Sequence, residues 1–314
     1  MCTSPLRAWR DPVRGVSFSK TSHSGEELEL PCGQCIECRF KRSRDWAIRC
    51  MHESQLHAEN AFITLTYAPQ HLPDNQSLDY AHFQKFMKRL RKRIGVPVRF
   101  YMCGEYGENF GRPHYHACIF GYGFPDRKFL MSTKNGDNLY TSELLNELWT
   151  FGLSSIGDVN FQSAAYVARY IMKKITGNAA FDHYNKVDED GVVISRVPEF
   201  TRMSLKPGIG AGWFDKYHSD VFPHDHVIVK GKEVSVPRYY TDKVRKAARR
   251  KEYEVASGVA SKAVLTLDEY DIDEIQYARL LRVRERAESD TPERRVARDE
   301  INRAKLKLLK RTIV

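Results

Sequence analysis

The sequence predicts an α+β fold, and three observations lead to that prediction. Runs rich in β-branched and aromatic residues at 61–67, 98–103 and 112–121 are typical of strands. Apolar residues at helical spacing within 83–94 predict an amphipathic helix between the first two strands. Gly and Asn residues separate the second and third runs, so we expect these two strands to form a hairpin or a neighbouring pair.

The composition indicates a folded protein with a polyanionic partner. A chain of 314 residues with 42% hydrophobic residues is long enough for one large domain, or for a domain with appendages. Its formal net charge of +10 favours binding to phosphates. Because neither an apolar leader nor an apolar run of about 18 residues is present, we expect a cytoplasmic protein with no membrane partner.

The pattern along the chain predicts three segments. Residues 1–58 contain an irregular start, a cysteine motif and a basic helix, and residues 59–240 contain the predicted strands. Residues 241–314 are rich in Arg, Lys, Glu and Ala, which predicts a charged helical tail with a break near 289–292. The stretch 121–137 resembles an insertion, and no chemistry is assigned to 176–240.

Three cysteines lie three residues apart: Cys32, Cys35 and Cys38. Thiolates at this spacing with a glycine between them are typical of one half of a zinc knuckle. A tetrahedral Zn²⁺ site needs a fourth ligand, which Cys2 or Cys50 would supply, whereas His52 suits the role less well. The alternative is that these cysteines are small buried apolar residues.

Two predicted helices carry many basic residues. The first covers about 37–59 and would bury one side and turn its arginines to phosphates or to solvent. The second covers 83–94, ends at Gly95, and has more charge than solubility requires. We therefore expect contacts to the DNA backbone from its basic residues and from the start of the third strand. The residues concerned are Lys85, Lys88, Arg89, Lys92 and Arg112.

The third strand carries a pair of histidines that could hold a metal ion. The period of two along a strand places His114 and His116 on one face and Tyr115 on the other, in the core. Glu105, at the end of the preceding strand, would lie close to the histidine face. Two imidazoles and a carboxylate leave positions open for water and substrate, as in a catalytic Mg²⁺ or Mn²⁺ site. The alternative is a structural histidine pair.

A later helix, at about 163–174, presents two tyrosines on one side. Ser163 is the expected N-cap. The tyrosines and a lysine are spaced by four residues, and a second lysine lies next to the last of them. The residues are Tyr166, Tyr170, Lys173 and Lys174. A tyrosine pair at this spacing is often core or interface, but beside a metal site it would be a pair of nucleophiles.

Three of these motifs, in this order, resemble those of the replication initiators of gokushoviruses, which are small single-stranded DNA phages and belong to the rolling-circle HUH endonucleases. The motifs are the strand 62–66, the His114-Tyr115-His116 strand, and the helix with Tyr166 and Tyr170. The element 31–39 also looks like the N-terminal cysteine motif of this group. The resemblance covers about residues 35–175.

The resemblance implies a fold and a mechanism. The fold would be a central antiparallel sheet of the RRM or ferredoxin-like kind, with the metal on its middle strands, the tyrosine helix packed across them and a helical C-terminal appendage. His114 and His116, with Glu105 as the third ligand, would hold Mg²⁺ or Mn²⁺ at the scissile phosphate. Tyr166 and Tyr170 would act in alternation, forming 5′-phosphotyrosyl links, with Lys173 or Lys174 positioning the phosphate.

The implied partners are single-stranded origin DNA, the double-stranded replicative form, and the helicase and polymerase of a bacterial host, in whose cytoplasm the protein would act. Three other classes remain. A metal-stabilised DNA-binding or packaging protein would leave the histidines and tyrosines without a role. A hydrolase using water would not need the tyrosine spacing, and an HUH relaxase or transposase would share the chemistry.

Overall fold

A computed structural model of the chain shows two compact units. One contains Met1–Arg42 and Asp273–Thr312, and the other contains Ser43–Ile272 and Ile313–Val314. The predicted division at residues 58 and 240 stays a prediction. The structure describes residues 2–11, 15–21, 25–107, 111–133, 136–173, 179–187, 191–222, 224–257, 272–287 and 289–308.

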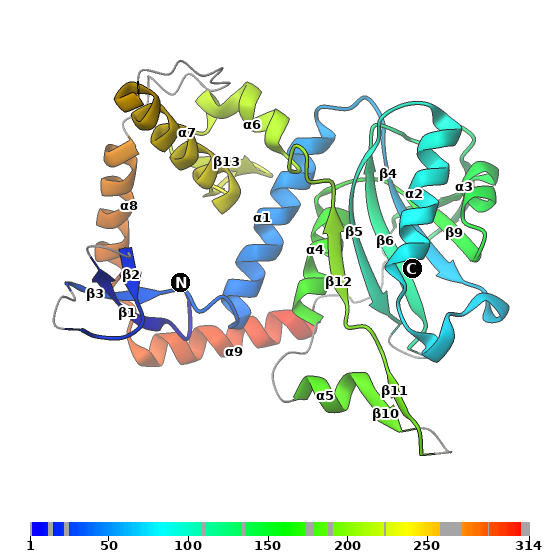
Figure 1. Ribbon diagram of the computed structural model, residues 1–314, viewed down its shortest axis with the longest axis horizontal. Helices are drawn as coiled ribbons and strands as arrows, with labels where there is room; N and C mark the ends of the chain where they lie inside the picture. Colours follow the sequence, from blue (N-terminus) through cyan, green and yellow to red (C-terminus); the bar gives the residue numbers. More distant parts are fainter. Residues whose placement is uncertain are drawn as a thin grey trace. The chain divides into compact units, whose positions relative to one another are not determined.

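The larger unit is built on a seven-stranded sheet in which every pair of neighbouring strands is antiparallel (Figure 1). This sheet, flanked by helices, confirms the predicted α+β class. The strand carrying the histidine pair lies in the interior of the sheet, between two long neighbours. In spatial order the strands are β12 (Phe200–Met203), β5 (Arg99–Tyr106), β6 (Pro113–Phe120), β4 (Asn60–Tyr67), β9 (Gly152–Gly157), β8 (Asn138–Thr141) and β7 (Lys128–Ser132).

One face of the sheet is covered by α2 (Tyr80–Ile94) and α3 (Glu143–Leu148), which pack on an apolar core. Asp79 caps α2, because its side chain accepts a hydrogen bond from the N–H of Ala81 at 2.8 Å. The helix ends at Gly95, whose φ of 68° suits the left-handed C-cap. Tyr115 is fully buried on this face, as predicted.

The other face is covered by α4 (Phe161–Lys173) and by residues of α1 (Ile36–Ser54). The N-cap expected at Ser163 is wrong, since α4 begins two residues earlier. Asn160 caps it instead: its side-chain oxygen accepts from the N–H of Ser163 at 2.9 Å, while the hydroxyl of Ser163 accepts from the N–H of Asn160 at 2.9 Å.

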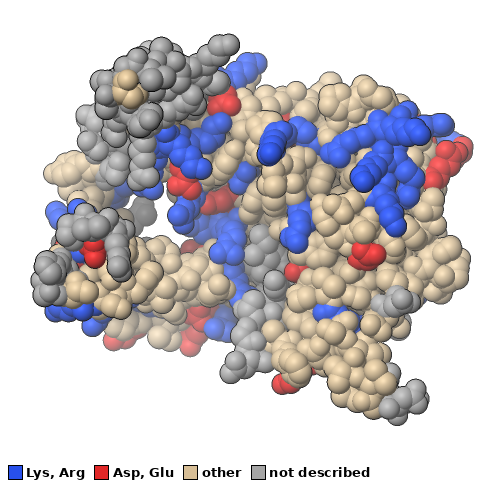
Figure 2. Space-filling view, viewed as in Figure 1, with Lys and Arg blue, Asp and Glu red and all other residues tan. Residues whose placement is uncertain are grey.

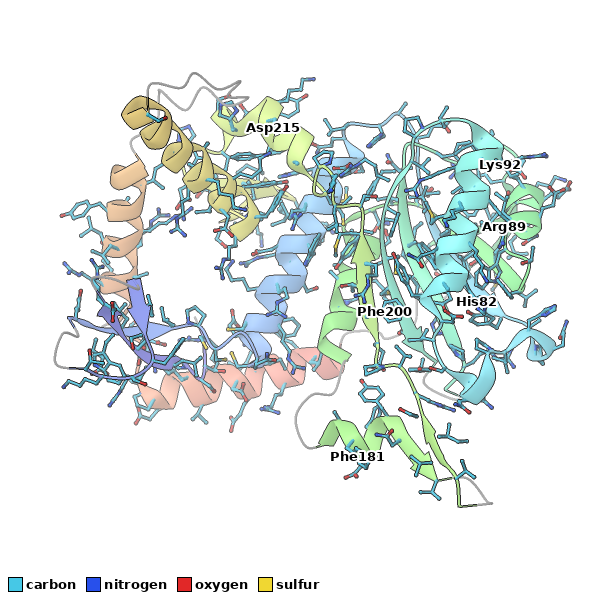
Figure 3. The ribbon with its side chains drawn as sticks, in the orientation of Figure 1. His82, Arg89, Lys92, Phe181, Phe200 and Asp215 are labelled. Atoms are coloured by element: carbon cyan, nitrogen blue, oxygen red, sulfur yellow. The ribbon has the colours of Figure 1, made fainter. Side chains whose placement is uncertain are left out.

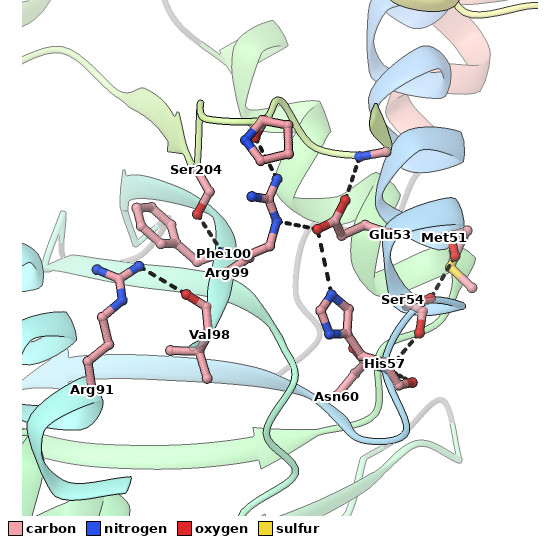
Figure 4. A network of polar contacts seen from close by, with 12 residues as sticks. Met51, Glu53, Ser54, His57, Asn60, Arg91, Val98, Arg99, Phe100 and Ser204 are labelled. Atoms are coloured by element: carbon pink, nitrogen blue, oxygen red, sulfur yellow. Dashed lines mark hydrogen bonds and ion pairs between the residues drawn. The ribbon is translucent and has the colours of Figure 1, made fainter. Parts of the chain in front are cut away.

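A polar network joins the end of α1 to the start of β5 (Figure 4). The buried carboxylate of Glu53 pairs with the guanidinium of Arg99 and accepts from the N–H of Gly210. Arg99 also donates to the carbonyl of Pro207 at 2.7 Å. These contacts hold the loop before α6 (Ala211–Tyr217) against the strand that carries Glu105 at its other end.

The remaining elements of this unit are short, apart from one helix near its C-terminal end. Some extend the chain between α4 and β12, and the others follow β12 or lie between β4 and α2. They are η1 (Pro69–His71), η2 (Asp74–Gln76), α5 (Ala179–Tyr184), β10 (Asn185–Val187), β11 (Val193–Ser195), η3 (His218–Asp220), β13 (His226–Val229), β14 (Lys232–Ser235) and α7 (Arg238–Ser257).

The smaller unit has a three-stranded antiparallel sheet in the order β2-β1-β3. Its other elements are the first turns of α1 and two helices of the C-terminal segment. The bounds are β1 (Leu6–Asp11), β2 (Gly15–Ser17), β3 (Glu27–Leu30), α8 (Ile272–Ala287) and α9 (Pro292–Leu308). The helical tail is therefore confirmed, and its break falls where the sequence predicts it. No described helix is long and apolar enough to cross a membrane.

Two predictions about irregular segments are wrong. Residues 1–30 contain the three strands of the smaller unit, and the stretch 121–137 contributes the edge strand β7 to the large sheet. In both places the strands are short and largely exposed, so their residues lack the alternation of apolar and polar side chains by which a half-buried strand is identified.

Candidate functional site

The carboxylate of Glu105 meets both histidines of the predicted metal strand. In the register of β5 and β6, Glu105 lies opposite His114 and Cys103 lies opposite His116. The Oε1 atom of Glu105 is 2.9 Å from Nε2 of His114 and 2.9 Å from Nε2 of His116. The three residues therefore present two imidazole nitrogens and a carboxylate oxygen within 4.8 Å of one another.

Each imidazole is oriented through its other ring nitrogen. The Nδ1 atom of His114 is 3.0 Å from the carbonyl oxygen of Arg112, and that of His116 is 2.9 Å from the hydroxyl of Thr64. Hydrogen bonds of this kind fix the ring orientation of metal-binding histidines. They turn both Nε2 atoms toward Glu105, as ligation of a shared ion requires.

The site is buried and carries negative charge. Glu105 is 1% exposed and His116 is 2% exposed. Burial alone would raise the pKa of Glu105, but hydrogen bonds from His114 and His116, with their positive charge, lower it to about 2. The carboxylate is thus ionised at neutral pH, in the state that binds a divalent cation.

The tyrosine helix α4 brings Tyr166 to this site. The hydroxyl of Tyr166 donates to Oε1 of Glu105 at 3.2 Å, and its ring meets the ring of His116 edge-on, with centroids 5.0 Å apart. Tyr166 is 4% exposed. The guanidinium of Arg169 lies 5.7 Å from the centre of its ring. A phenolic oxygen, a carboxylate and two imidazoles therefore converge at one point.

The second tyrosine cannot be placed in the same way. Tyr170 and Lys173 belong to α4, but their side chains lie outside the described residues, as does the whole of Lys174. The pairing of Tyr166 with Tyr170 along one side of the helix stays a prediction.

The predicted DNA-binding residues fall into two groups. Lys85, Lys88 and Lys92 are exposed on α2, and Figure 2 shows Lys and Arg side chains gathered over this helix. This is the face of the sheet opposite the histidines, since α2 packs against Tyr115, with the rings of Phe83 and Tyr115 6.0 Å apart. The structure thus does not bring these lysines to the candidate metal site.

Two arginines in that set are partly engaged with the backbone. Arg89, labelled on α2 with Lys92 in Figure 3, donates from Nε to the carbonyl of Leu148 at 2.9 Å. Arg112 precedes β6, two residues from His114, and donates to the carbonyl of Tyr67 at 3.2 Å. Of the five predicted residues, Arg112 is the one in the segment that orients His114.

A second cluster of candidate ligands joins four cysteines of the smaller unit: Cys2, Cys32, Cys35 and Cys38. Cys2 is thus the residue that completes the set. The alternative fourth ligands lie in the core of the larger unit, where Cys50 is fully buried. His52 contacts the hydroxyl of Tyr240 through Nδ1 at 2.9 Å.

Two residues at the candidate metal site escaped prediction, namely Thr64 and Arg169. The sequence places Thr64 on a strand, but its partnership with His116 depends on the register of β4 against β6, in which the two residues lie opposite each other. Arg169 lies three residues after Tyr166 on a helix, which is the spacing at which side chains meet. That spacing was the one available signal.

Comparisons with known proteins agree on one family. A family model described as the replication-associated protein ORF2 matches residues 60–175, the segment from β4 to the end of α4. The chain is 35% identical over 256 residues to the replication-associated protein VP4 of Bdellovibrio phage phiMH2K, covering 78% of this chain and 77% of that protein.

Two further relatives come from other phages. The chain is 32% identical over 225 residues to the replication-associated protein ORF4 of Chlamydia phage 1, covering 69% of this chain and 54% of that protein. It is 32% identical over 224 residues to the replication-associated protein ORF2 of Spiroplasma virus 4, covering 67% and 66%. No solved structure matches the chain.

Proposed function

The chain belongs to the replication-associated proteins of small phages, which are replication initiators, and from this premise we propose that it nicks and rejoins origin DNA with a tyrosine nucleophile. The observation that carries the proposal is the contact between Tyr166 and Glu105. A hydroxyl nucleophile within 3.2 Å of a carboxylate that also meets two histidines is placed beside a three-ligand metal site.

The donor set fits Mg²⁺ or Mn²⁺. Two imidazole nitrogens and an ionised carboxylate oxygen come within reach of one ion, and three protein ligands leave positions for phosphate oxygens and water. When bound, such an ion would polarise the scissile phosphate and neutralise charge that develops during in-line displacement.

The chain itself supplies the nucleophile and its positioning. The Tyr166 oxygen forms a bond to phosphorus as the bond from phosphorus to the 3′ oxygen breaks, which leaves the 5′ end on the protein and a free 3′-OH. One phosphodiester replaces another, so rejoining needs no ATP. The positive charge of Arg169 beside the ring favours the phenolate.

A second tyrosine would allow the reaction to be repeated. Tyr170 follows Tyr166 by one helical turn in α4. While one tyrosine holds the 5′ end, the other cuts the regenerated origin, and the released 3′-OH then attacks the first link and closes a circle. Lys173 or Lys174 would position the phosphate.

The expected partners follow from the reaction. The cut strand is single-stranded at the site, and the duplex replicative form would contact the lysines of α2. A host polymerase extends the 3′-OH and a host helicase opens the duplex, which places the reaction in the cytoplasm of a bacterium.

The test is covalent capture of DNA. The protein is incubated with Mn²⁺ and tiled single-stranded fragments of the phage genome, and denaturing gels report protein linked to the 5′ product. We expect the adduct with wild type and with Tyr277→Phe, an exposed tyrosine of α8 that serves as the control. We expect none with the Tyr166→Phe/Tyr170→Phe double variant or with His114→Ala/His116→Ala.

The outcomes separate the alternatives. Cleavage without an adduct would indicate hydrolysis by water and would contradict the tyrosine mechanism. Full activity of the double variant would exclude both tyrosines as nucleophiles. Binding of DNA without cleavage of any fragment would leave the protein in the class of non-catalytic DNA-binding proteins.

A further inference from the structure

Four sulfur atoms from two distant parts of the chain meet in the smaller unit. Sγ of Cys2 lies 3.5 Å from Sγ of Cys32 and 3.6 Å from Sγ of Cys35. With Cys38, in the first turn of α1, these atoms all lie within 4.8 Å of one another. The start of the chain is thereby brought to a position where it completes a four-sulfur set.

The backbone around the cluster has the form that thiolate ligands require. Gly33 adopts a φ of +73°, which favours glycine and lets the chain turn tightly between Cys32 and Cys35. The N–H of Cys32 donates to Sγ of Cys2 at 3.3 Å, and the N–H of Cys35 donates to Sγ of Cys32 at 3.2 Å. Such donors orient thiolate ligands and stabilise their charge.

The sulfur separations match a tetrahedral metal site. Zn–S bonds of about 2.3 Å at the tetrahedral angle place neighbouring sulfurs about 3.8 Å apart. The separations of 3.5 and 3.6 Å are close to this value and far above the roughly 2.04 Å of a disulfide. Four thiolates in this geometry are the donor set of a structural zinc ion.

The smaller unit lacks the apolar core that would otherwise hold it together. Among its described side chains, Ala8 is the one apolar residue that is fully buried. Several large apolar residues of this unit remain exposed, including Phe18 at 63% and Ile301 at 54%. Small units without a core are commonly held by disulfides or by a structural metal.

Polar contacts next to the ligands tie α9 to the same point. Thr3, which follows Cys2, donates to the carboxylate of Asp299 at 3.3 Å. Asn302, which is 7% exposed, donates to the carboxylate of Glu37, next to Cys38, at 2.6 Å. Two ligand-bearing segments thus each place one side chain on α9.

We propose that Cys2, Cys32, Cys35 and Cys38 bind one structural Zn²⁺ that takes the place of a hydrophobic core and joins the start of the chain, the start of α1 and α9 into one unit. The ion is bound by four deprotonated thiols, so binding releases their protons and no electron is transferred. This role is separate from the nicking reaction and does not depend on it.

The test measures zinc in the full-length protein in a His114→Ala/His116→Ala background, so that the other candidate site contributes none. We expect one equivalent of zinc by elemental analysis, lost in Cys2→Ser and retained in Cys50→Ala. Cys50 is the matched control, because it is a free cysteine outside the cluster. Cys2→His, which keeps a zinc ligand, should restore the ion.

A second measurement reports the structural role. Hydrogen exchange should show that a strong zinc chelator removes protection from β1, β3 and α9 but leaves β4, β5 and β6 protected, which also shows that the variant protein is folded. Zinc retained in Cys2→Ser, iron bound in place of zinc, or unchanged protection after chelation would each overturn the proposal.

Discussion

Thr64 fixes the ring of His116 through a hydrogen bond of 2.9 Å between its hydroxyl and Nδ1. Thr64→Val keeps the shape of the side chain but removes this partner, so the imidazole loses its orientation. Because outer partners of this kind contribute about 10–100-fold to metal affinity, we expect Mn²⁺ to bind that much more weakly. Titration calorimetry of the purified protein measures the change.

Two variants serve as controls for this prediction. Thr64→Ser retains the hydroxyl and should restore the affinity for Mn²⁺. Thr66→Val, two residues along the same strand, should leave it unchanged. An unaltered dissociation constant in Thr64→Val would show that the hydroxyl does not orient the ligand.

At the residue scale, the period of two along a strand was enough to predict the histidine pair. It placed His114 and His116 on one face and Tyr115 in the core, and the structure confirms this arrangement. Glu105 was predicted from its place near the turn, and β5 in fact extends to Tyr106, so that Glu105 lies directly opposite His114. Thr64 was not predicted as an orienting residue, because its partner depends on strand register.

At the scale of an element, α1 carries a buried histidine that should make stability depend on pH. Burial lowers the pKa of His52 to about 4, from 6.5 in an exposed state. Between about pH 6.5 and 4 the unfolded chain therefore binds the extra proton, so the free energy of unfolding falls as pH falls through this window. The loss amounts to about 3 kcal/mol when the window has been crossed.

His52→Gln removes the titrating group but can still donate to the hydroxyl of Tyr240. We expect urea unfolding of this variant to show a flatter dependence on pH between 6.5 and 4 than wild type. His71→Gln, at an exposed histidine, is the control and should behave as wild type. Equal pH dependence of wild type and His52→Gln would contradict the account.

The helix α2 should contribute to DNA affinity but not to cleavage. Its exposed lysines lie on the face of the sheet opposite the histidine pair, so they would contact DNA away from the cut. Each phosphate contact contributes about 0.9 to the slope of log affinity against log salt, so Lys85→Gln/Lys88→Gln should reduce that slope by about 1.8 for duplex DNA.

Fluorescence anisotropy at several salt concentrations measures this slope. Lys230→Gln/Lys232→Gln removes the same charge from an exposed hairpin and is the matched control, expected to leave the slope unchanged. Cleavage of a short single strand by Lys85→Gln/Lys88→Gln should match wild type. A slope that does not change would exclude α2 from the DNA interface.

Elements with strong local signals were predicted, and elements held by distant partners were not. The strand at 61–67 and the helix at 83–94 correspond to β4 and α2, with ends shifted by one to three residues. The short strand β12 escaped prediction, since its four residues gain their partner, β5, from about a hundred residues earlier in the chain. Propensity within a window cannot report such pairing.

At the scale of the whole molecule, the sequence predicted the chemistry of two candidate metal sites better than the grouping of the chain into units. The cysteine spacing indicated a metal site, but the choice of Cys2 over Cys50 needed the fold of the smaller unit. Residues from both ends of the sequence form that unit, and no local pattern connects them.

The central claim is that Tyr166, held on Glu105 beside the histidine pair, attacks origin DNA. Mass spectrometry of the peptides released from the covalent complex tests it most directly. We predict a nucleotide attached through a 5′-phosphate to Tyr166 in wild type, and no attachment at this position after His114→Ala/His116→Ala. A nucleotide found only on a residue outside α4, or a 5′ product with a free phosphate and no linked peptide, would contradict the account.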